Sequence, residues 1–199
     1  MTSPGVSAFT ARTIDGATLD CFEQGRGGPL LLGTGLSGTA EFWTDISSTL
    51  ARSFRVLRFD QRGIAGSDRG TAACTIEVLA QDARAVLDAV GLDRAVVLGH
   101  SAGGCIGQSP AKQAPARIDG LILTGSNTDA RSSLSARVTL GLPVVYAYAP
   151  SRGKADRSVV PDNVRAGRDA TGRLAECGRT SIALIGAEEH WTASTDRIN

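Results

Sequence analysis

Short segments rich in hydrophobic residues alternate with longer amphipathic stretches along most of the chain. Such segments are too short for buried helices and are typical of strands covered on both faces of a sheet. A hairpin is predicted at the start of the chain, because the turn signal Asp15-Gly16 separates two further strand candidates. The predicted strands are 8–12, 17–22, 29–33, 55–59, 95–98, 121–124 and 182–185.

The clearest predicted helix begins after Thr75, a good N-cap, and ends before Gly91, a good residue to follow a helix. Another helix is predicted over 42–51, and a third after residue 101. Strands that alternate with helices indicate a mostly parallel sheet with helices on both faces, whose ligands bind beyond the carboxyl ends of the strands. The apolar positions of the clearest helix keep the spacing of one buried face: Leu79, Ala83, Val86, Leu87 and Val90.

A serine stands at one of those strand ends. Ser101 is the centre of Gly99-His100-Ser101-Ala102-Gly103, directly after the apolar run 95–98 and before a predicted helix. In this G-x-S-x-G pattern the glycines leave room for a sharp turn, and the serine is exposed as a nucleophile. The pattern alone is weak, because glycine and serine are common residues.

Composition narrows the possible function classes. The chain has 199 residues, 42% of them hydrophobic and 21% charged, with a net charge of +1. We therefore expect a globular enzyme or binding protein without a nucleic acid or membrane partner. The first residues have no pattern of a signal peptide, and no apolar stretch approaches the length of a membrane helix.

The cysteines and histidines bear on compartment and metal binding. Four dispersed cysteines without a C-x-x-C pair favour a reducing, cytoplasmic location. With only His100 and His190 in the chain, a zinc site of the usual spacing is not expected.

The segment 131–179 differs from the rest of the chain. It is rich in basic residues and contains scattered glycine and proline, and no periodic element is predicted through it. Two interpretations stay open: a solvated lid-like or poorly ordered insertion, and a cationic lid that attracts an anionic substrate. The whole chain, 1–199, is predicted to be a single domain.

Three stretches together resemble the α/β-hydrolase superfamily: Gly33-Thr34-Gly35-Leu36-Ser37-Gly38, with Phe42-Trp43 behind it; Phe59-Asp60-Gln61-Arg62-Gly63-Ile64-Ala65-Gly66-Ser67; and the turn around Ser101. The branch that contains β-ketoadipate enol-lactonases and aminoacrylate hydrolases is the most similar. The resemblance covers about residues 10–130 and returns at Leu184–Glu189. It implies the α/β-hydrolase fold and hydrolysis of a small carboxylic ester or lactone through an acyl-enzyme, with no cofactor and no metal.

The resemblance also implies roles for particular residues. Ser101 would be the nucleophile, and the backbone N–H groups of Ala102 and Leu36 would form the oxyanion hole. Glu189 would be the acid that orients a histidine, with Glu188 as the alternative if the alignment shifts by one residue. Asp60 would support the turn without taking part in the chemistry.

The sequence departs from the family pattern in several places. The family histidine follows an eighth strand, whereas this sequence ends at Asn199, without that strand and with His190 as its last histidine. His190 could serve only through an unusual local geometry, and His100 is expected to be a packed residue that points away from Ser101. Three smaller departures are Thr34 in place of histidine, Ala65 in place of glycine, and Pro110 within the predicted helix after the serine.

Two functions from different classes therefore stay open. One is a serine hydrolase, active or truncated and impaired. The other is a non-catalytic protein of the same fold that binds a ligand or partner in the remaining pocket. The sequence does not predict an oligomeric state.

Overall fold

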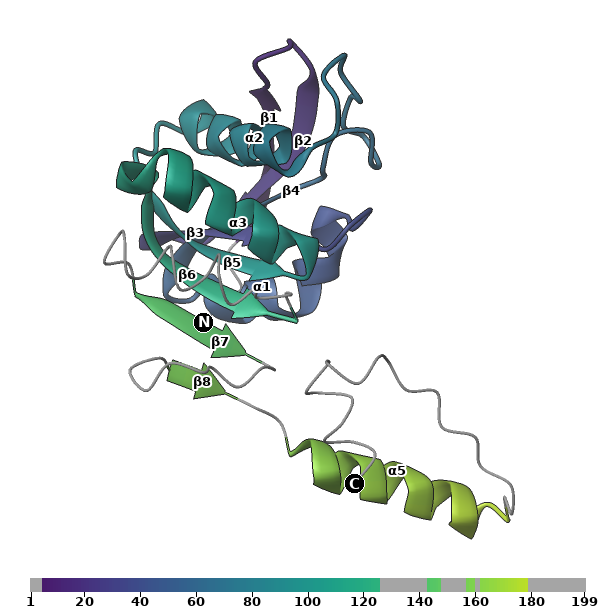
Figure 1. Cartoon of the computed structure of the whole chain (residues 1–199). Coiled ribbons are helices and arrows are strands. Elements are labelled where there is room, and N and C mark those ends of the chain that lie inside the picture. Colours follow the sequence, from purple (N-terminus) through teal and green to yellow (C-terminus); the bar gives the residue numbers. More distant parts are fainter. Residues whose placement is uncertain (1–4, 126–142, 148–156, 160–161, 179–199) are drawn as a thin grey trace. The chain divides into compact units, whose positions relative to one another are not determined.

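A computed structural model of the chain describes residues 5–125, 143–147, 157–159 and 162–178 (Figure 1). The chain divides into two compact units, Met1–Val145 and Tyr146–Asn199. The sheet and the sequence-predicted nucleophile belong to the first unit, and each unit is described by itself below.

The first unit is built on a mixed, mostly parallel sheet. Its strands run in the order β1-β2-β4-β3-β5-β6, followed by the first two residues of β7, whose last two residues belong to the second unit. Strands β1 and β2 form the predicted antiparallel hairpin, β2 pairs antiparallel with β4, and the pairs β3–β4, β3–β5 and β5–β6 are parallel. The strands are β1 (Val6–Arg12), β2 (Thr18–Gln24), β3 (Gly28–Gly33), β4 (Phe54–Phe59), β5 (Ala95–His100), β6 (Ile118–Thr124) and β7 (Val144–Ala147).

Helices cover both faces of this sheet, as the pattern predicts. On one face α2 (Ile76–Ala89) and α3 (Ala102–Gln113) lie across the strands (Figure 1), where Leu31 and Val97 share a narrow apolar cavity with Leu87 and Ile106. On the other face α1 (Thr44–Leu50) follows the 3-10 turn η1 (Ala40–Trp43), and a second 3-10 turn, η2 (Pro115–Arg117), precedes β6. The core on the α1 side contains Leu30, Leu32, Trp43, Ala51 and Val56.

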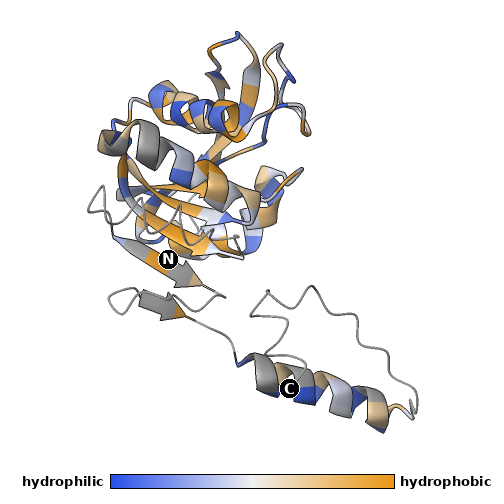
Figure 2. Ribbon diagram, in the orientation of Figure 1, coloured by the Kyte–Doolittle hydropathy of each residue, from blue (hydrophilic) through white to orange (hydrophobic). Residues whose placement is uncertain are grey.

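Alternation along β3 explains why its apolar run is unbroken. Leu30 and Leu32 pack toward α1, whereas Leu31 packs toward α2 and α3, and each is at most 3% exposed. Successive side chains of a strand point to opposite faces, so a strand covered on both faces needs apolar residues throughout. Figure 2 shows the resulting concentration of hydrophobic residues in the sheet.

The ends of α2 carry the predicted signals. The Thr75 hydroxyl accepts a hydrogen bond from the N–H of Val78 at 3.3 Å, and Gly91 adopts φ +67° just beyond the helix. A left-handed residue at this position is easiest for glycine, which has no Cβ. Helix α3 runs from Ala102 to Gln113, so the predicted helix after the serine is present and continues through position 110.

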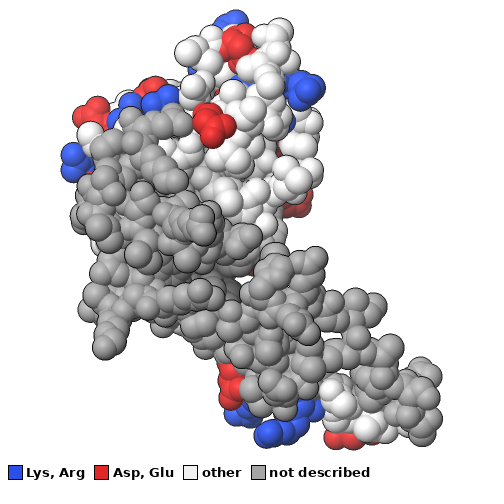
Figure 3. Space-filling model, viewed as in Figure 1, with Lys and Arg blue, Asp and Glu red and all other residues white. Residues whose placement is uncertain are grey.

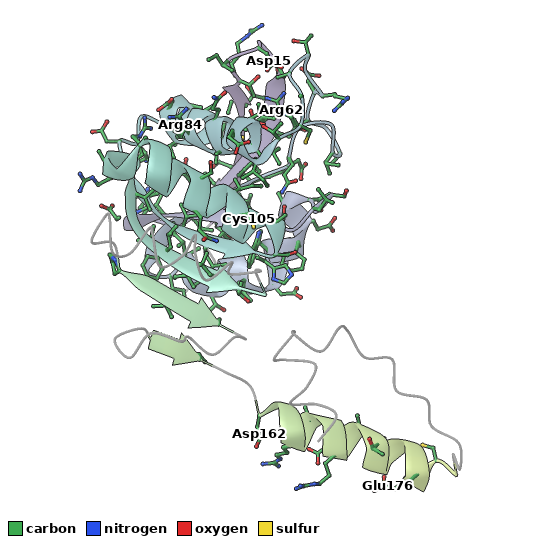
Figure 4. All side chains as sticks on the ribbon, viewed as in Figure 1. Asp15, Arg62, Arg84, Cys105, Asp162 and Glu176 are labelled. Carbon is green, nitrogen blue, oxygen red and sulfur yellow. The ribbon has the colours of Figure 1, made fainter. Side chains whose placement is uncertain are left out.

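The segment after β4 is tied to the rest of the unit by a buried cation. The Arg62 guanidinium makes two hydrogen bonds of 2.7 Å to the Asp82 carboxylate on α2. It also contacts Asp15 in the β1–β2 turn at 3.1 Å (Figure 4). The Arg62 side chain is fully buried and that of Asp82 is 1% exposed. These ion pairs join the hairpin, the loop after β4 and α2, which are far apart in sequence.

The second unit contributes β8 (Arg157–Val159) and α5 (Asn163–Glu176). No element was predicted over 131–179, which is wrong for β7, β8 and α5. All of the described side chains of α5 are exposed, and they include Lys or Arg and Asp or Glu (Figure 3), so the described residues show no buried face that would have marked a helix. Its signals are instead the Asp162 N-cap, which accepts from the Arg165 N–H at 2.9 Å, and the surface pairs Arg165–Asp169 and Arg173–Glu176.

All four cysteines are free thiols, and burial raises the pKa of Cys21 on β2 to about 12. None of the helices in the described part of the chain has the length and apolar character needed to cross a bilayer. The single-domain organisation and the lid-like role of 131–179 stay predictions.

Candidate active site

The predicted nucleophile lies at the junction of β5 and α3. Ser101 has φ +52°, a left-handed conformation that a residue with a side chain rarely adopts. Its N–H donates to the Thr124 carbonyl of β6 at 3.0 Å, and its carbonyl accepts from the Gly104 N–H at 3.0 Å. The chain thus turns from strand into helix within one residue, which is the geometry that the G-x-S-x-G pattern predicts.

Two glycines beside Ser101 are required by close backbone contacts. A Cβ on Gly99 would lie 2.5 Å from the Gly103 carbonyl oxygen. A Cβ on Gly103 would overlap the carbonyl group of Gly33 at the end of β3. Both distances are too short for a side chain. The prediction that these glycines leave room for a sharp turn is therefore confirmed. The first turn of α3 therefore packs directly on the backbone of β3.

The loop after β3, Gly33–Gly38, lies against the serine. The position of a Cβ on Gly35 would be 3.3 Å from Ser101 Cβ and 3.7 Å from Ser101 Oγ. The N–H groups of Leu36 in this loop and of Ala102 at the start of α3 make no hydrogen bond with any residue of the described part. The structure thus brings the predicted nucleophile and the two predicted oxyanion donors into neighbouring segments.

A buried glutamine supports the same loop. Gln61 follows β4 and is 4% exposed. Its side-chain N–H groups donate to the Thr34 carbonyl at 3.1 Å, to the Thr34 hydroxyl at 3.3 Å and to the Gly35 carbonyl at 3.2 Å. No role was predicted for Gln61 from the sequence. One signal was available in the sequence: Gln61 stands between the charged residues Asp60 and Arg62, directly after a buried strand.

Thr34 replaces the histidine of many relatives and closes the loop on itself. It is 2% exposed, and its hydroxyl donates to the Gly38 carbonyl at 3.0 Å. The Gly38 N–H in turn donates to the Gly35 carbonyl at 3.0 Å. The loop is therefore a compact turn held by its own hydrogen bonds and by Gln61.

His100 is packed beside the serine, as expected. Its ring stacks on Phe42, with 5.1 Å between the centroids and 22° between the planes, and Phe42 contacts Trp43 edge to face. Phe42 is 56% exposed and Leu36 is 77% exposed. Two large apolar side chains are thus accessible on segments next to Ser101.

The carboxylate of Asp60 has a structural partner, which agrees with its predicted supporting role. It accepts a hydrogen bond from the Ala40 N–H at 2.6 Å, at the start of η1. Ala65, in the same motif, has φ +47°, which explains why relatives carry glycine there. Among the residues that the structure describes, no cluster of His, Cys, Asp and Glu could hold a metal ion.

The other predicted residues of the site lie outside the described residues. These are Glu189, its alternative Glu188, and His190. The acid therefore stays a prediction, and the role of His190 stays open.

The comparisons with known proteins agree with this geometry. The sequence profile of the alpha/beta hydrolase fold family matches residues 28–143, which is more than half of the chain. The chain belongs to the α/β-hydrolase family. The matched region of this α/β-hydrolase includes β3 to β6, the loop after β3 and the turn at Ser101.

Two curated relatives show how much of the α/β-hydrolase is shared. The RutD protein of Azorhizobium caulinodans, whose name describes a carbamate hydrolase, is 38% identical over 100 residues, which are 50% of this chain and 38% of the relative. The 2-hydroxymuconate semialdehyde hydrolase of Pseudomonas sp. strain CF600 is 32% identical over 158 residues, which are 76% of this chain and 54% of that protein. The chain thus spans about two fifths to half of the length of these relatives.

Solved structures show the same fold. A hydrolase from Pseudomonas aeruginosa PA01 superposes with a TM-score of 0.58 and 25% identity, over 96% of this chain and 66% of that one. Est816, described as an N-acyl homoserine lactone degrading enzyme, superposes with a TM-score of 0.57 and 30% identity, over 59% of this chain and 45% of that one. The predicted α/β-hydrolase fold is confirmed.

Proposed function

We propose that this α/β-hydrolase hydrolyses small carboxylic esters or lactones through an acyl-enzyme formed on Ser101. The contact between Gly35 and Ser101 carries the proposal, because it brings a loop with an unused N–H group beside the candidate nucleophile. Acyl transfer needs a nucleophile and preorganised donors for the negative charge that develops on the carbonyl oxygen. Ser101, Leu36 and Ala102 would supply these parts without a cofactor.

The reaction would proceed in two halves. Ser101 Oγ attacks the carbonyl carbon while its proton passes to a base, and the oxyanion lies between the N–H groups of Leu36 and Ala102. Collapse expels the alcohol, which takes up the proton, and leaves an acyl-enzyme. Water then attacks the same carbon, and the acid is released. Removing one donor of this kind typically costs about 3 kcal/mol of transition-state stabilisation.

The base and its orienting acid complete the proposal. A serine hydroxyl needs a base to become an effective nucleophile, and loss of one triad residue typically lowers turnover by about 10⁴-fold. Glu189 is proposed as the acid and His190 is the remaining histidine of the sequence, since the His100 ring is stacked on Phe42. A labelling experiment with a reactive phosphonate tests directly whether Ser101 is activated.

The substrate side is supported by exposed apolar groups and by the names of relatives. Leu36 and Phe42 offer hydrophobic contact to a small acyl group beside Ser101. Among the proteins similar to this chain, one degrades N-acyl homoserine lactones and another is named for carbamate hydrolysis. A carbamate has a carbonyl that the same serine would attack, so a substrate screen should include carbamates. The dispersed free cysteines support a reducing, cytoplasmic compartment.

The test is intact-mass spectrometry after treatment with a fluorophosphonate probe. We expect one adduct on the wild-type chain, none on Ser101→Ala, and one on the control Ser109→Ala, which removes a hydroxyl from α3, the helix that follows Ser101. No adduct on a chain shown by circular dichroism to be folded would contradict the proposal. A ligand-binding role would then be supported by thermal stabilisation that persists in Ser101→Ala.

A further inference from the structure

Resting on the function proposed above, we propose that Gln61 is a positioning residue that aims the Leu36 N–H at the oxyanion. Gln61 does not itself touch the reacting atoms in this proposal. It acts through the loop after β3, to which its side chain makes all of the hydrogen bonds given above. Those bonds hold the two peptide groups on either side of Gly35.

The Gly35 carbonyl and the Leu36 N–H belong to the same peptide group. The group is planar and trans, because the chain contains no cis peptide bond, so its C=O and N–H point in opposite directions. The oxygen accepts from Gln61 Nε2 at 3.2 Å and from the Gly38 N–H at 3.0 Å. Two donors on one carbonyl oxygen fix the plane, and the N–H is thereby held on the side away from Gln61.

The peptide group before Gly35 is held in the same way. Gln61 Nε2 donates to the Thr34 carbonyl at 3.1 Å, and the Thr34 hydroxyl bridges to the Gly38 carbonyl at 3.0 Å. Gly35 is therefore fixed on both sides, and it is the residue that contacts Ser101. A rotation of either peptide plane would turn the Leu36 N–H away and break a hydrogen bond inside the buried cluster.

The chemistry of glutamine suits this role. Two of the three atoms facing Gln61 Nε2 are carbonyl oxygens, which can only accept, so the amide nitrogen and not its oxygen must face the loop. The donor is neutral, so it holds the loop without adding charge beside the oxyanion. Burial keeps water from competing for these carbonyls, because Gln61 is 4% exposed. A buried side chain that lost these bonds would leave the carbonyls without their donor.

The first test measures the loop and does not depend on activity. In ¹⁵N relaxation measurements we expect the Leu36 amide of the wild type to be as ordered as the strands, and that of Gln61→Leu to be mobile. Hydrogen exchange at the Gly38 amide should accelerate at least tenfold. Gln81→Leu, a similar change on α2, is the control and should alter neither. Unchanged order at Leu36 and unchanged exchange at Gly38 in a folded Gln61→Leu would overturn the proposal.

A second variant keeps the test valid if Gln61→Leu does not fold. Gln61→Glu retains the shape, but its ionised carboxylate cannot donate to the three oxygens. Once protonated it carries one O–H donor. We therefore expect Leu36 to gain order as the pH falls from 8 to 5, which a merely space-filling role would not produce. Order that is independent of pH and equal to the wild type would contradict the assignment.

The third measurement separates this proposal from the proposed function. In fluorophosphonate labelling, Gln61→Leu should lower the maximal inactivation rate at least tenfold and leave the half-saturating probe concentration unchanged. If the half-saturating probe concentration rises as the maximal rate falls, the variant has also lost probe binding. That result would indicate a general loss of structure and overturn the positioning role. If the wild type itself is not labelled, the proposed function fails, whereas the loop measurements still decide what Gln61 does.

Discussion

Gln61 and Arg62 are neighbours in sequence, but they organise different regions of the molecule in different ways. Gln61 uses a neutral amide to hold the backbone of the loop beside Ser101. Arg62 uses a buried cation to hold the β1–β2 turn and α2 through Asp15 and Asp82. Both side chains are almost fully buried.

The difference reflects what each region has to do. A reacting site that develops negative charge benefits from fixed dipoles, and a neutral donor can set them without disturbing the field there. A scaffold contact has no such restriction, and a bidentate arginine–carboxylate pair links distant segments with a defined geometry. We therefore expect changes at Arg62 to act on stability and changes at Gln61 to act on the site loop.

The largest expected effect comes from Arg62→Met. Removing the cation leaves the buried Asp82 carboxylate without its partner, which typically costs about 3–5 kcal/mol. Urea unfolding should show this loss of free energy of unfolding, whereas the Leu36 amide of the folded fraction should keep its order. The double variant Arg62→Met/Asp82→Leu should regain part of the loss. A loss below about 0.5 kcal/mol for Arg62→Met would show that this pair does not hold the scaffold.

A medium effect is expected inside the site region, where Ser101 stores backbone strain. A left-handed residue with a side chain costs about 1–2 kcal/mol relative to glycine. Ser101→Gly should therefore be more stable than Ser101→Ala in thermal and urea unfolding, since both variants lack the hydroxyl and differ in the cost of φ +52°. Equal stability of the two variants would mean that the turn relaxes when the hydroxyl is removed.

The smallest effect on stability is expected for a change at Asp15, because the Arg62 cation still has its ion pair with Asp82 when the Asp15 carboxylate is removed. Hydrogen bonds from the Thr13 hydroxyl, the Ala72 N–H and Arg62 hold the pKa of Asp15 well below its ordinary value of 3.8. The unfolded chain therefore takes up this proton at a higher pH than the folded chain. The stabilisation is complete above the ordinary value and is lost as the pH falls below it.

Asp15→Asn tests that sign. Unfolding free energies measured between pH 5 and pH 2 should fall less steeply for Asp15→Asn than for the wild type. At neutral pH the variant should be the less stable of the two. Parallel pH profiles for the two proteins would show that Asp15 is not the titrating group.

The fold was largely predictable because its signals are local. The apolar run of β3, the Thr75 cap and the glycines around Ser101 each correspond to a requirement of one strand, one helix end or one turn. Helix α5 escaped prediction because its described side chains are all exposed, and the signals they carry are a cap and surface ion pairs.

The candidate site was predictable only in part. Ser101, Leu36 and Ala102 lie in glycine-rich turns that resemble the family, and the structure brings them together. The role of Gln61 depends on the loop carbonyls of Thr34 and Gly35, which are 27 and 26 positions away in sequence. No local pattern encodes such a contact, so it appears only once β3 and β4 are paired.

The backbone contact between Gly33 and Gly103 has a consequence for how this scaffold can be adapted. The backbones of Gly33 and Gly103 are in direct contact, so a side chain added at Gly103 would push the first turn of α3 away from β3 and change the spacing of the two proposed oxyanion donors. That spacing thus depends on a backbone contact and not on the side chains that would select a substrate. Diversification toward larger or smaller acyl groups would have to use exposed positions such as Leu36 and Phe42, whose side chains can vary in size while the backbone beneath them stays in place.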